Sequence, residues 1–417
     1  MRRMGQADFR GRVVRTVRKP GRSAERRTGR GASGRARVLG ALALGVTALA
    51  ATALAAPGAV AAPAASPDAT GRSGTAWGGE AWSGAGSGSE AGHGAGWDLK
   101  DTGTDARFRG LAAVSRTTAW AAGSRGTVLR TADGGRSWRD VSPPGAAGLE
   151  FRDVEAFDGR RAVVLAIGEG EASRVYRTTD GGATWTEAFR NPDPKAFYDC
   201  MTFFDRRHGL AVSDPVDGKY RMLSTADGGR SWKVLPNRGM PAAQDGEAAF
   251  AASGQCLVST GPRDAWLATG GAARARVLHS ADRGLTWTVA DAPIPAGDPA
   301  RGVFGLAFRD RAHGLAVGGD YRPGQPSPTA SAVTRDGGRT WRPSARPAPA
   351  YRSGVAWLPH SRTTALAVGP TGTDLTTDAG RTWRTVDDGS YDTVDCARDF
   401  GCWAAGEKGR VARLEPR

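Results

Sequence analysis

The sequence predicts an all-β protein built from repeated units of four short strands, and three observations carry this prediction. An eight-residue pattern, [ST]-x-D-x-G-x-[ST]-W, occurs six times in the 417-residue chain. Successive copies lie 42 to 55 residues apart, counted between their tryptophans. Three short strand-like segments precede the first copy, and the same order recurs before the others. A repeat of about 40–50 residues that holds four strands is typical of one blade of a β-propeller.

The eight-residue pattern is suited to closing a β-hairpin. Its Asp can accept hydrogen bonds from backbone N–H groups just ahead, and the Gly can adopt a positive φ, which together make a tight turn. The Trp begins the strand that leaves the turn, where its ring can be buried while the indole N–H reaches a carbonyl. We therefore expect these residues to be structural rather than catalytic. They are Asp133, Trp138, Asp180, Trp185, Asp227, Trp232, Asp282, Trp287, Asp336, Trp341, Asp378 and Trp383.

These repeats resemble the Asp-box (BNR) repeats of sialidases and of photosystem II stability/assembly-factor-like propellers. The resemblance extends over about residues 97–415. It implies that each repeat lies at the turn between the two outer strands of a blade. That turn is on the face opposite the one that usually binds ligands. The resemblance is specific for the fold and says little about function.

The chain divides into six complete units and one incomplete unit. In the first unit we expect strands at residues 108–114, 118–123, 127–131 and 138–141. The following units lie near residues 151–193, 197–243, 250–298, 303–348 and 351–388. A seventh unit begins at Tyr391 and ends without the eight-residue pattern or a fourth strand.

The missing fourth strand is expected at the other end of the domain. Residues 96–101 resemble residues 137–141, the strand that leaves the first copy of the pattern. Three strands from the C-terminal end and one from the N-terminal end would complete the last blade and leave no exposed sheet edge between them. We predict an all-β, seven-bladed β-propeller over residues 97–417, closed into a ring by its N-terminal strand.

Residues 1–61 have the composition of a secretory signal peptide with a long basic n-region. The first 37 residues hold thirteen Lys and Arg against two acidic residues, and an uncharged run of 19 residues follows. A small-residue A-x-A site ends at Ala61. An uncleaved membrane anchor is the alternative, because 19 residues can just span a bilayer, but the high Ala and Gly content favours cleavage. We therefore predict a secreted or extracytoplasmic protein of the cell envelope, with membrane contact only through an uncleaved signal segment.

The basic n-region also explains most of the charge of the chain. It carries +11 of the formal +15, which leaves about +4 on the remaining residues. The high sequence pI of about 10.4 therefore does not indicate a nucleic-acid partner. Residues 62–96 are rich in Gly, Ala, Ser and Pro and are predicted to form a flexible linker.

Four cysteines in an exported protein permit disulfides. Cys396 and Cys402 lie on the first hairpin of the last blade and can bridge it. Cys200 and Cys256 are at similar depth on inner strands of adjacent blades, where they can pair or remain buried thiols. No C-x-x-C or His pair has the spacing of metal ligands, so no metal is expected. No nucleotide, haem or flavin motif is present either, so no cofactor is expected.

Charged residues are expected to gather at the face opposite the eight-residue patterns. The inner strands start there with Arg109, Arg152 and Arg352 and with Asp199 and Asp392, so these side chains should ring one mouth of the central channel. The long loops that reach the same face contribute Asp214, Asp217 and Glu247. Convergent charge at a concave mouth is the default position for a binding site in this architecture. A solvated polar rim is the alternative.

Three classes of function fit these features. The resemblance to assembly factors implies a scaffold that binds protein partners, and the arginines favour an acidic partner or an acidic glycan. A glycoside hydrolase, either sialidase-like or an Asp-box glycanase with two carboxylates, is the alternative. The Arg-Ile-Pro motif of sialidases is absent, however, and no pair of carboxylates stands out. A redox-associated propeller is the third class. The sequence favours a monomeric binding or scaffold protein over an enzyme.

Overall fold

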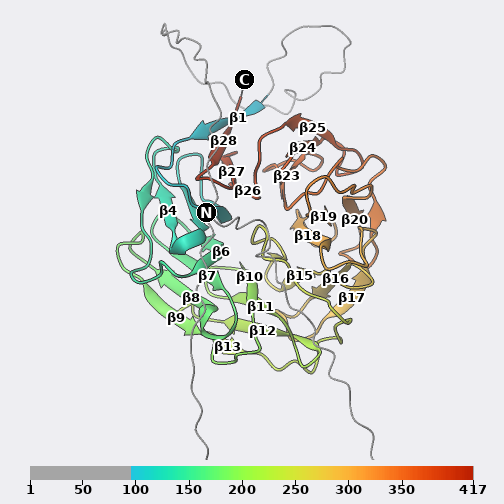
Figure 1. Cartoon of the computed structure of the whole chain (residues 1–417), viewed down its shortest axis with the longest axis horizontal. Helices are drawn as coiled ribbons and strands as arrows, with labels where there is room; N and C mark the ends of the chain where they lie inside the picture. Colours follow the sequence, from blue (N-terminus) through green and yellow to red (C-terminus); the bar gives the residue numbers. More distant parts are fainter. Residues whose placement is uncertain (1–94, 417) are drawn as a thin grey trace, which may run out of the picture. The chain divides into compact units, whose positions relative to one another are not determined.

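The computed structural model describes residues 95–416, which form seven four-stranded antiparallel sheets arranged as blades around a central axis (Figure 1). In blades 1 to 6 the first strand in the sequence lies next to the axis and the following three lie successively farther out; in the last blade the order from the axis outward is β26, β27, β28 and β1. The predicted all-β, seven-bladed propeller is therefore confirmed. The predicted signal peptide and almost all of the predicted linker lie outside the described residues.

The first three blades follow the predicted layout. Blade 1 contains β2 (Phe108–Ala113), β3 (Ala119–Gly123), β4 (Val128–Thr131) and β5 (Arg139–Asp140). Blade 2 contains β6 (Glu150–Ala156), β7 (Ala162–Ile167), β8 (Arg174–Thr178) and β9 (Thr186–Arg190). Blade 3 contains β10 (Tyr198–Phe203), β11 (Gly209–Val216), β12 (Lys219–Thr225) and β13 (Lys233–Val234).

The remaining blades continue around the ring. Blade 4 contains β14 (Leu257–Thr260), β15 (Asp264–Ala268), β16 (Arg276–Ser280) and β17 (Thr288–Asp291). Blade 5 contains β18 (Arg301–Phe308), β19 (Gly314–Asp320), β20 (Ser331–Thr334) and β21 (Arg342–Pro343). Blade 6 contains β22 (Gly354–Trp357), β23 (Ala365–Gly369), β24 (Gly372–Thr376) and β25 (Arg384–Asp387). Blade 7 contains β26 (Thr393–Cys396), β27 (Cys402–Ala405), β28 (Val411–Pro416) and β1 (Ala95–Lys100).

One expected boundary is wrong. The fourth unit was expected to begin near residue 250, but its inner strand begins at Leu257. Residues 248–256 form no strand of that sheet: only Ala248 and Cys256, at their two ends, bond to the backbone of blade 4, and Ser253 and Gln255 bond to blades 6 and 7. Helical structure in the described residues is limited to the single turns η1 (Ser124–Gly126) and η2 (Gly170–Ala172). No helix in that part of the chain could therefore cross a membrane.

The eight-residue patterns close the turns between third and fourth strands. In the first copy, Asp133 Oδ1 accepts hydrogen bonds from Thr131 Oγ1 at 2.9 Å and from the Ser137 N–H at 3.0 Å, while Oδ2 accepts from Ser137 Oγ at 2.6 Å. The other five copies repeat these three bonds. The bonds from Ser137 lower the pKa of Asp133 to about 2. Each carboxylate is thus used within its own turn.

The tryptophans of the patterns pack between blades. Trp138 meets Trp403 of blade 7 edge-on at 5.9 Å between ring centroids, and Trp185 meets Trp120 of blade 1 in the same way at 6.4 Å. The expectation that the indole N–H reaches a carbonyl holds for Trp185 and Trp287. In the other four copies the indole nitrogen is buried without an acceptor among the described residues. Ring packing rather than hydrogen bonding therefore explains the repeated tryptophan.

Strand β1 closes the ring, as predicted. It pairs with β28 along its whole length, with Trp97 opposite Leu414. The Trp97 ring is buried, lies 5.5 Å from the Tyr391 ring, and donates its indole N–H to Thr373 Oγ1 of blade 6 at 2.9 Å.

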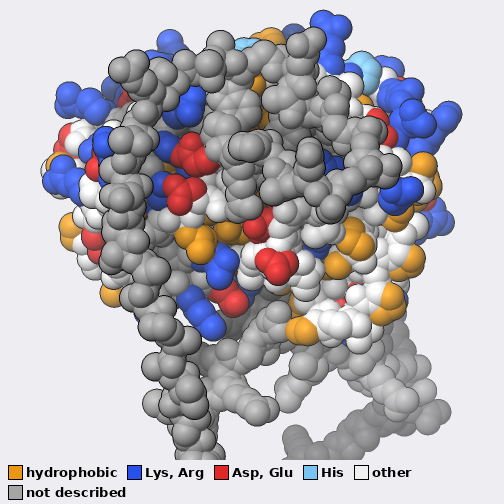
Figure 2. Space-filling view, turned by 90° about the horizontal axis from the view of Figure 1, so that it is seen from above, with side chains coloured by type: hydrophobic (Ala, Val, Ile, Leu, Met, Phe, Trp, Pro, Cys, Tyr) orange, Lys and Arg blue, Asp and Glu red, His pale blue; other side chains and the backbone are white. Residues whose placement is uncertain are grey.

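On the side of the molecule seen in Figure 2, acidic and basic side chains are interspersed wherever the described surface is visible.

Replacing Trp97 tests this closure. Because Trp97→Ala removes a buried ring and its hydrogen bond to blade 6, we expect it to lower the free energy of unfolding by about 3–5 kcal/mol. Leu99 lies on the same strand with its side chain 57% exposed, so Leu99→Ala should change stability by less than about 0.5 kcal/mol. Chemical denaturation of both variants measures the difference. Equal losses would contradict the proposed role of β1.

Candidate functional site at the channel mouth

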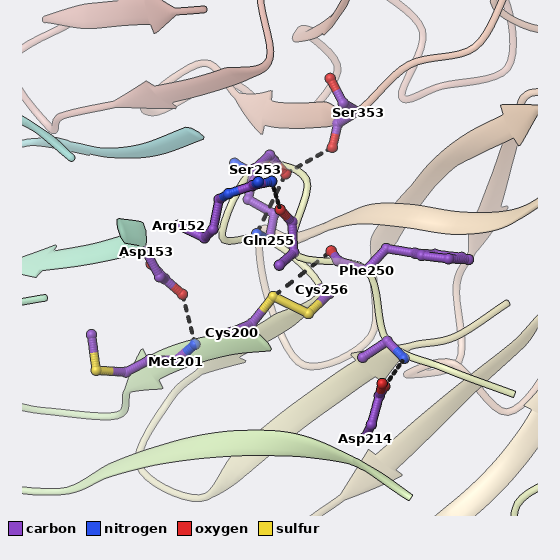
Figure 3. The surroundings of a disulfide bond; sticks show 12 residues. Arg152, Asp153, Cys200, Met201, Asp214, Phe250, Ser253, Gln255, Cys256 and Ser353 are labelled. Atoms are coloured by element: carbon purple, nitrogen blue, oxygen red, sulfur yellow. Dashed lines mark hydrogen bonds between the residues drawn. A yellow bond between two sulfur atoms is a disulfide. The ribbon is translucent and has the colours of Figure 1, made fainter. Parts of the chain in front are cut away.

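Residues 248–256, which we call the channel loop, cross the central channel between the outer strand of blade 3 and the inner strand of blade 4. Ser253 Oγ donates a hydrogen bond to the Ser353 carbonyl of blade 6 at 2.7 Å (Figure 3). Thr393 of blade 7 donates to the Ser253 carbonyl at 3.0 Å. Gln255 Nε2 donates to the Val394 carbonyl at 2.8 Å. The loop is thus bonded to the blades on the far side of the axis.

Further bonds attach the channel loop to its nearer neighbours. A disulfide joins Cys256 to Cys200 of β10, with their Cα atoms 5.9 Å apart (Figure 3). Asp214 of blade 3 accepts a hydrogen bond from the Ala249 N–H at 3.0 Å, and Arg152 of blade 2 donates to the Ala251 carbonyl at 3.2 Å. A ligand that reaches the mouth therefore meets the channel loop.

Gly254 shows how closely the loop fits the channel wall. Its φ is +77°, a conformation that favours glycine, and an added Cβ would lie 2.8 Å from Asp153 Oδ1 of blade 2. The second disulfide, Cys396–Cys402, lies across the first hairpin of blade 7 and is remote in sequence from the loop.

The three arginines predicted to ring the mouth do not form an open ring. Arg352 is 1% exposed and points into its own blade, where Nε donates to Asp374 Oδ2 of β24 at 2.7 Å and Nη1 donates to Thr371 Oγ1 at 3.0 Å. Arg152 is buried and holds the channel loop. Arg109 is buried with Nε 3.9 Å from Asp392 Oδ2. Arg352 therefore has a structural role. Of the three predicted arginines, only Arg109 lies beside the predicted Asp392.

A fourth arginine, which sequence reasoning missed, completes this group. Arg107 Nε donates to Asp392 Oδ2 at 2.6 Å and Nη2 donates to Oδ1 at 2.7 Å. Its side chain is 29% exposed, against 8% for Arg109. Alternate residues of an extended strand point to the same side, so the Arg-x-Arg sequence at the start of the first inner strand was the signal that could have found it.

Aromatic rings lie beside these arginines. The Phe304 ring stacks on Phe250 of the channel loop at 4.1 Å between centroids, and Tyr351 and Tyr321 approach it edge-on at 4.8 and 6.0 Å. Both tyrosines are half-buried, and burial raises the pKa of each, with Asp392 and Arg109 also acting on Tyr351. The hydroxyls therefore remain protonated donors at neutral pH. Arg107, Arg109, Asp392, Phe250, Phe304, Tyr321 and Tyr351 are together called the mouth cluster.

The other predicted acidic residues are bonded in different parts of the molecule. Asp199 is fully buried on β10. Asp217 lies at the exposed turn after β11 and pairs with Lys195 at 3.2 Å. Glu247 is buried, and its Oε1 accepts from Thr269 Oγ1 at 2.5 Å and from Arg276 Nε at 2.8 Å. Asp214 of β11 bonds to the channel loop. These four carboxylates therefore lie in separate local environments and do not form a common acidic site.

Three further carboxylates lie between the inner strands and were not predicted. Asp153 Oδ2 accepts from the Met201 N–H of β10 at 2.6 Å, and Asp395 Oδ2 accepts from the Ala113 N–H of β2 at 2.8 Å. Burial raises the pKa of Asp153, Glu155 and Asp395, and in Glu155 the charges of the other two add to the effect. These groups satisfy backbone N–H groups at the edges of neighbouring blades. No group of three or more His, Cys, Asp or Glu within residues 95–416 could hold a metal ion.

Comparison with known proteins identifies similar folds. No protein-family profile and no curated protein sequence matches the chain. A solved structure of YCF48 bound to D1 peptide is 15% identical, with a TM-score of 0.52, and the match covers 77% of this chain and 95% of that one. The Neurospora crassa Pan2 WD40 domain is 14% identical, with a TM-score of 0.54, over 74% and 89%. U3-55K is 12% identical, with a TM-score of 0.53, over 77% and 98%. At these identities the similarity shows the propeller fold alone.

The inner-strand carboxylates predict a pH dependence of stability. Asp and Glu in an unfolded chain have pKa values near 4, so a raised pKa in the folded state means that folding takes up protons above about pH 4. The stabilisation from these groups is present at low pH and is lost as the pH rises through the folded-state pKa. Glu155→Gln keeps an oxygen that can accept from Phe203 and removes the charge. We expect this variant to be more stable than the wild type at pH 7, with a smaller difference at pH 5.

Thermal unfolding at the two pH values measures this effect. Glu171→Gln is the matched control, because the Glu171 side chain is 69% exposed. A Glu155→Gln variant that is destabilised at pH 7 would show that the ionised carboxylate is needed in the channel.

Arg352 predicts a second effect on stability. Lys keeps the charge but cannot bond to Asp374, Thr371 and the Tyr351 carbonyl at once, as Arg352 does. We expect Arg352→Lys to lower the free energy of unfolding by about 1.5–3 kcal/mol. Arg384→Lys, on the exposed outer strand of the same blade, should remain within about 0.5 kcal/mol of the wild type. Urea denaturation distinguishes them, and an unchanged Arg352→Lys variant would refute the structural role.

Proposed function

We propose that this protein is an extracytoplasmic, non-catalytic scaffold propeller that binds an acidic segment of a partner protein at the channel mouth. The observation that carries this proposal is the mouth cluster, in which Arg107, Arg109 and two half-buried tyrosines lie together with Phe250 of the channel loop. Tyr and Arg are among the residue types that contribute most to binding free energy in protein interfaces. The extracytoplasmic location rests on the signal-like composition of residues 1–61.

Arg107 is the residue best placed to recognise a carboxylate. It uses Nε and Nη2 for Asp392, and a guanidinium has five N–H donors, so further donors are left for a second acid. Arg–carboxylate bonds are charge-assisted and often bidentate, which gives both affinity and orientation. Tyr321 and Tyr351, each with a protonated hydroxyl, can contribute apolar contact and a hydrogen bond to the same ligand. An acidic peptide is therefore the ligand class that fits these side chains.

The channel loop favours a macromolecular partner over a small substrate. Pockets for small molecules are concave and enclose most of the ligand, whereas the loop is bonded across the axis at this mouth. Glycoside hydrolysis needs two carboxyl groups flanking the scissile bond. Asp392 is bonded to Arg107 and Glu247 to Arg276, which leaves the hydrolase alternative without a supporting pair. The redox alternative has no supporting motif in the sequence.

The structural comparisons agree with this class of function. The YCF48 structure is described as bound to a D1 peptide, so a propeller of this fold can hold a peptide. The Asp-box resemblance of the six repeats points to the same group of propellers. WD40 domains, which are also similar in fold, fit a binding role as well. These similarities support a scaffold, and the mouth cluster supplies the acidic preference.

Arg107→Lys tests this proposal. The probe is a short fluorescein-labelled peptide of glutamates with one tyrosine, and binding is followed by fluorescence anisotropy. Loss of charge-assisted bonds of about 1.5–3 kcal/mol should weaken binding roughly ten-fold or more. Arg125→Lys is the matched control, because Arg125 is exposed in blade 1 and pairs with Asp105 at the surface. Unfolding experiments should show that both variants fold normally.

Other outcomes would redirect the proposal. Equal binding by Arg107→Lys and wild type would place the acidic ligand elsewhere. Preference for polygalacturonate or a sialylated sugar over the peptide, with the same dependence on Arg107, would identify a glycan ligand. Glycan hydrolysis that is lost in Asp392→Asn would support the hydrolase instead.

A further inference from the structure

A groove lies between the outer hairpin of blade 5 and the eight-residue turn of blade 6. Its volume is about 490 Å³. It is lined by Val333, Arg335, Asp336, Thr340, Arg342, Pro343, Ala345 and Arg381. Because the turns between third and fourth strands lie at the opposite ends of the strands from the starts of the inner strands, this groove is remote from the mouth cluster.

Val333 explains why the groove is open. It directly precedes the first residue of the pattern in blade 5, and the corresponding residues of blades 1 and 2 are Arg130 and Arg177. Arg130 donates to the Gly159 carbonyl of the next blade, and Arg177 Nε donates to the Gly228 carbonyl at 2.8 Å. Each of these arginines thus occupies the space between blades. The shorter side chain of Val333 packs against Gly380 and the apolar core of blade 6 but has no guanidinium to bond a carbonyl there.

The groove is positively charged. Arg335, Arg342 and Arg381 are exposed, and the charge of Arg381 also helps to lower the pKa of Asp378 in its own turn, after the hydrogen bonds from Thr382. The one acidic lining residue, Asp336, is already used: Oδ1 accepts from the Thr340 N–H at 2.9 Å and Oδ2 from Thr340 Oγ1 at 2.6 Å. Its carboxylate is therefore held within its turn, and three guanidinium groups remain available to a ligand.

A second groove, between blades 3 and 4, provides a comparison. The residue at the position of Val333 there is Ser224, and the groove has a volume of about 510 Å³. Its Arg283 already donates to the Pro262 carbonyl at 2.8 Å and lies 3.9 Å from Asp205. A small residue at this position thus accompanies an open groove in both places. The groove of blades 3 and 4 also holds Lys233 and Arg263 and is lined by the ring of Phe204, whereas the lining of the groove of blades 5 and 6 holds three arginines and no aromatic ring.

We propose that the groove between blades 5 and 6 binds an acidic peptide segment that carries an aliphatic side chain. Arginine forks match carboxylates in a bidentate geometry, and Val333, Pro343 and Ala345 provide an aliphatic surface for the apolar side chain. The lining contains no aromatic ring that could stack on a sugar, which favours a peptide over an acidic glycan. Pro343 has no N–H to offer to an added strand, so recognition occurs through side chains. This site is independent of the mouth cluster and allows one propeller to hold two acidic segments.

Filling the groove and removing its charge test the proposal separately. The probe is a short fluorescein-labelled peptide of glutamates with one central leucine, and its binding is followed by fluorescence anisotropy on the full chain carrying Arg107→Lys, so that the mouth cluster contributes little to the signal. Val333→Arg adds a positive charge but fills the groove as Arg130 and Arg177 do elsewhere, so we expect binding to fall at least ten-fold. The double variant Arg342→Gln, Arg381→Gln should also fall at least ten-fold, since each substitution removes a charge-assisted contact.

The control removes charge from exposed arginines near the corresponding turns of other blades. Arg139→Gln combined with Arg230→Gln should leave binding of the leucine peptide within about two-fold of the wild type, because neither residue lines this groove. Unfolding midpoints should show that all variants are folded.

Several results would overturn the proposal. If the Val333→Arg variant binds the peptide as well as the wild type, or better, binding depends on the net charge of the protein and not on the shape of the groove. An equal loss in the Arg139 and Arg230 control would lead to the same conclusion. Stronger binding of polygalacturonate than of the peptide would assign the groove to a glycan. Failure of the leucine peptide to bind the Arg107→Lys chain, before any change in the groove, would leave the mouth as the acidic site and eliminate the groove.

Discussion

The hydrogen bonds from side chains of one inner strand to the backbone of the next hold this ring together around its axis. Each blade is a separate sheet, so the inner edges would otherwise leave N–H groups buried and unbonded at a substantial cost. Asp153 and Glu155 of β6 accept from backbone N–H groups of β10, and Asp395 of β26 accepts from β2. Gln255 Oε1 of the channel loop likewise accepts from the Val355 N–H of blade 6 at 2.7 Å. Buried charge is the consequence, because carboxylates perform part of this role.

The channel loop extends the same principle across the axis and thereby shapes the mouth. Its bonds to blades 2, 3, 6 and 7 require Ser253, Gln255 and Cys256 to be in place together. Phe250 is carried into the mouth cluster as part of that arrangement, where it stacks on Phe304. The stability of the ring and the form of the candidate binding surface therefore depend on the same segment.

The fold could be predicted from the sequence because its signals are local and repeated. Six turns with the same hydrogen bonds, each ending in a tryptophan directly before the fourth strand, define the blades. The β1–β28 pairing could be predicted because residues 96–101 resemble the strand that leaves the first of these turns. The channel loop could not be predicted, because residues 248–256 are mostly Ala, Ser and Gly and their bonds join positions 100 to 140 residues apart. The direction of Arg352 was missed for a different reason: its partner Asp374 lies only 22 residues away, on the third strand of the same blade, and no sequence pattern marks that pair.

The arginines of this propeller have different roles, and the group to which each one is bonded determines its role. Arg352 is buried against Asp374 and stabilises a blade, whereas Arg152 holds the channel loop. Arg130 and Arg177 close gaps between blades by bonding to carbonyls. A guanidinium whose donors are all used in this way can bind a ligand only by giving up a charge-assisted bond, whereas Arg107 keeps donors beyond those that it gives to Asp392. The arginines that can recognise an acid are therefore those with donors to spare, such as Arg107 at the mouth and the exposed arginines beside Val333, wherever they lie on the ring.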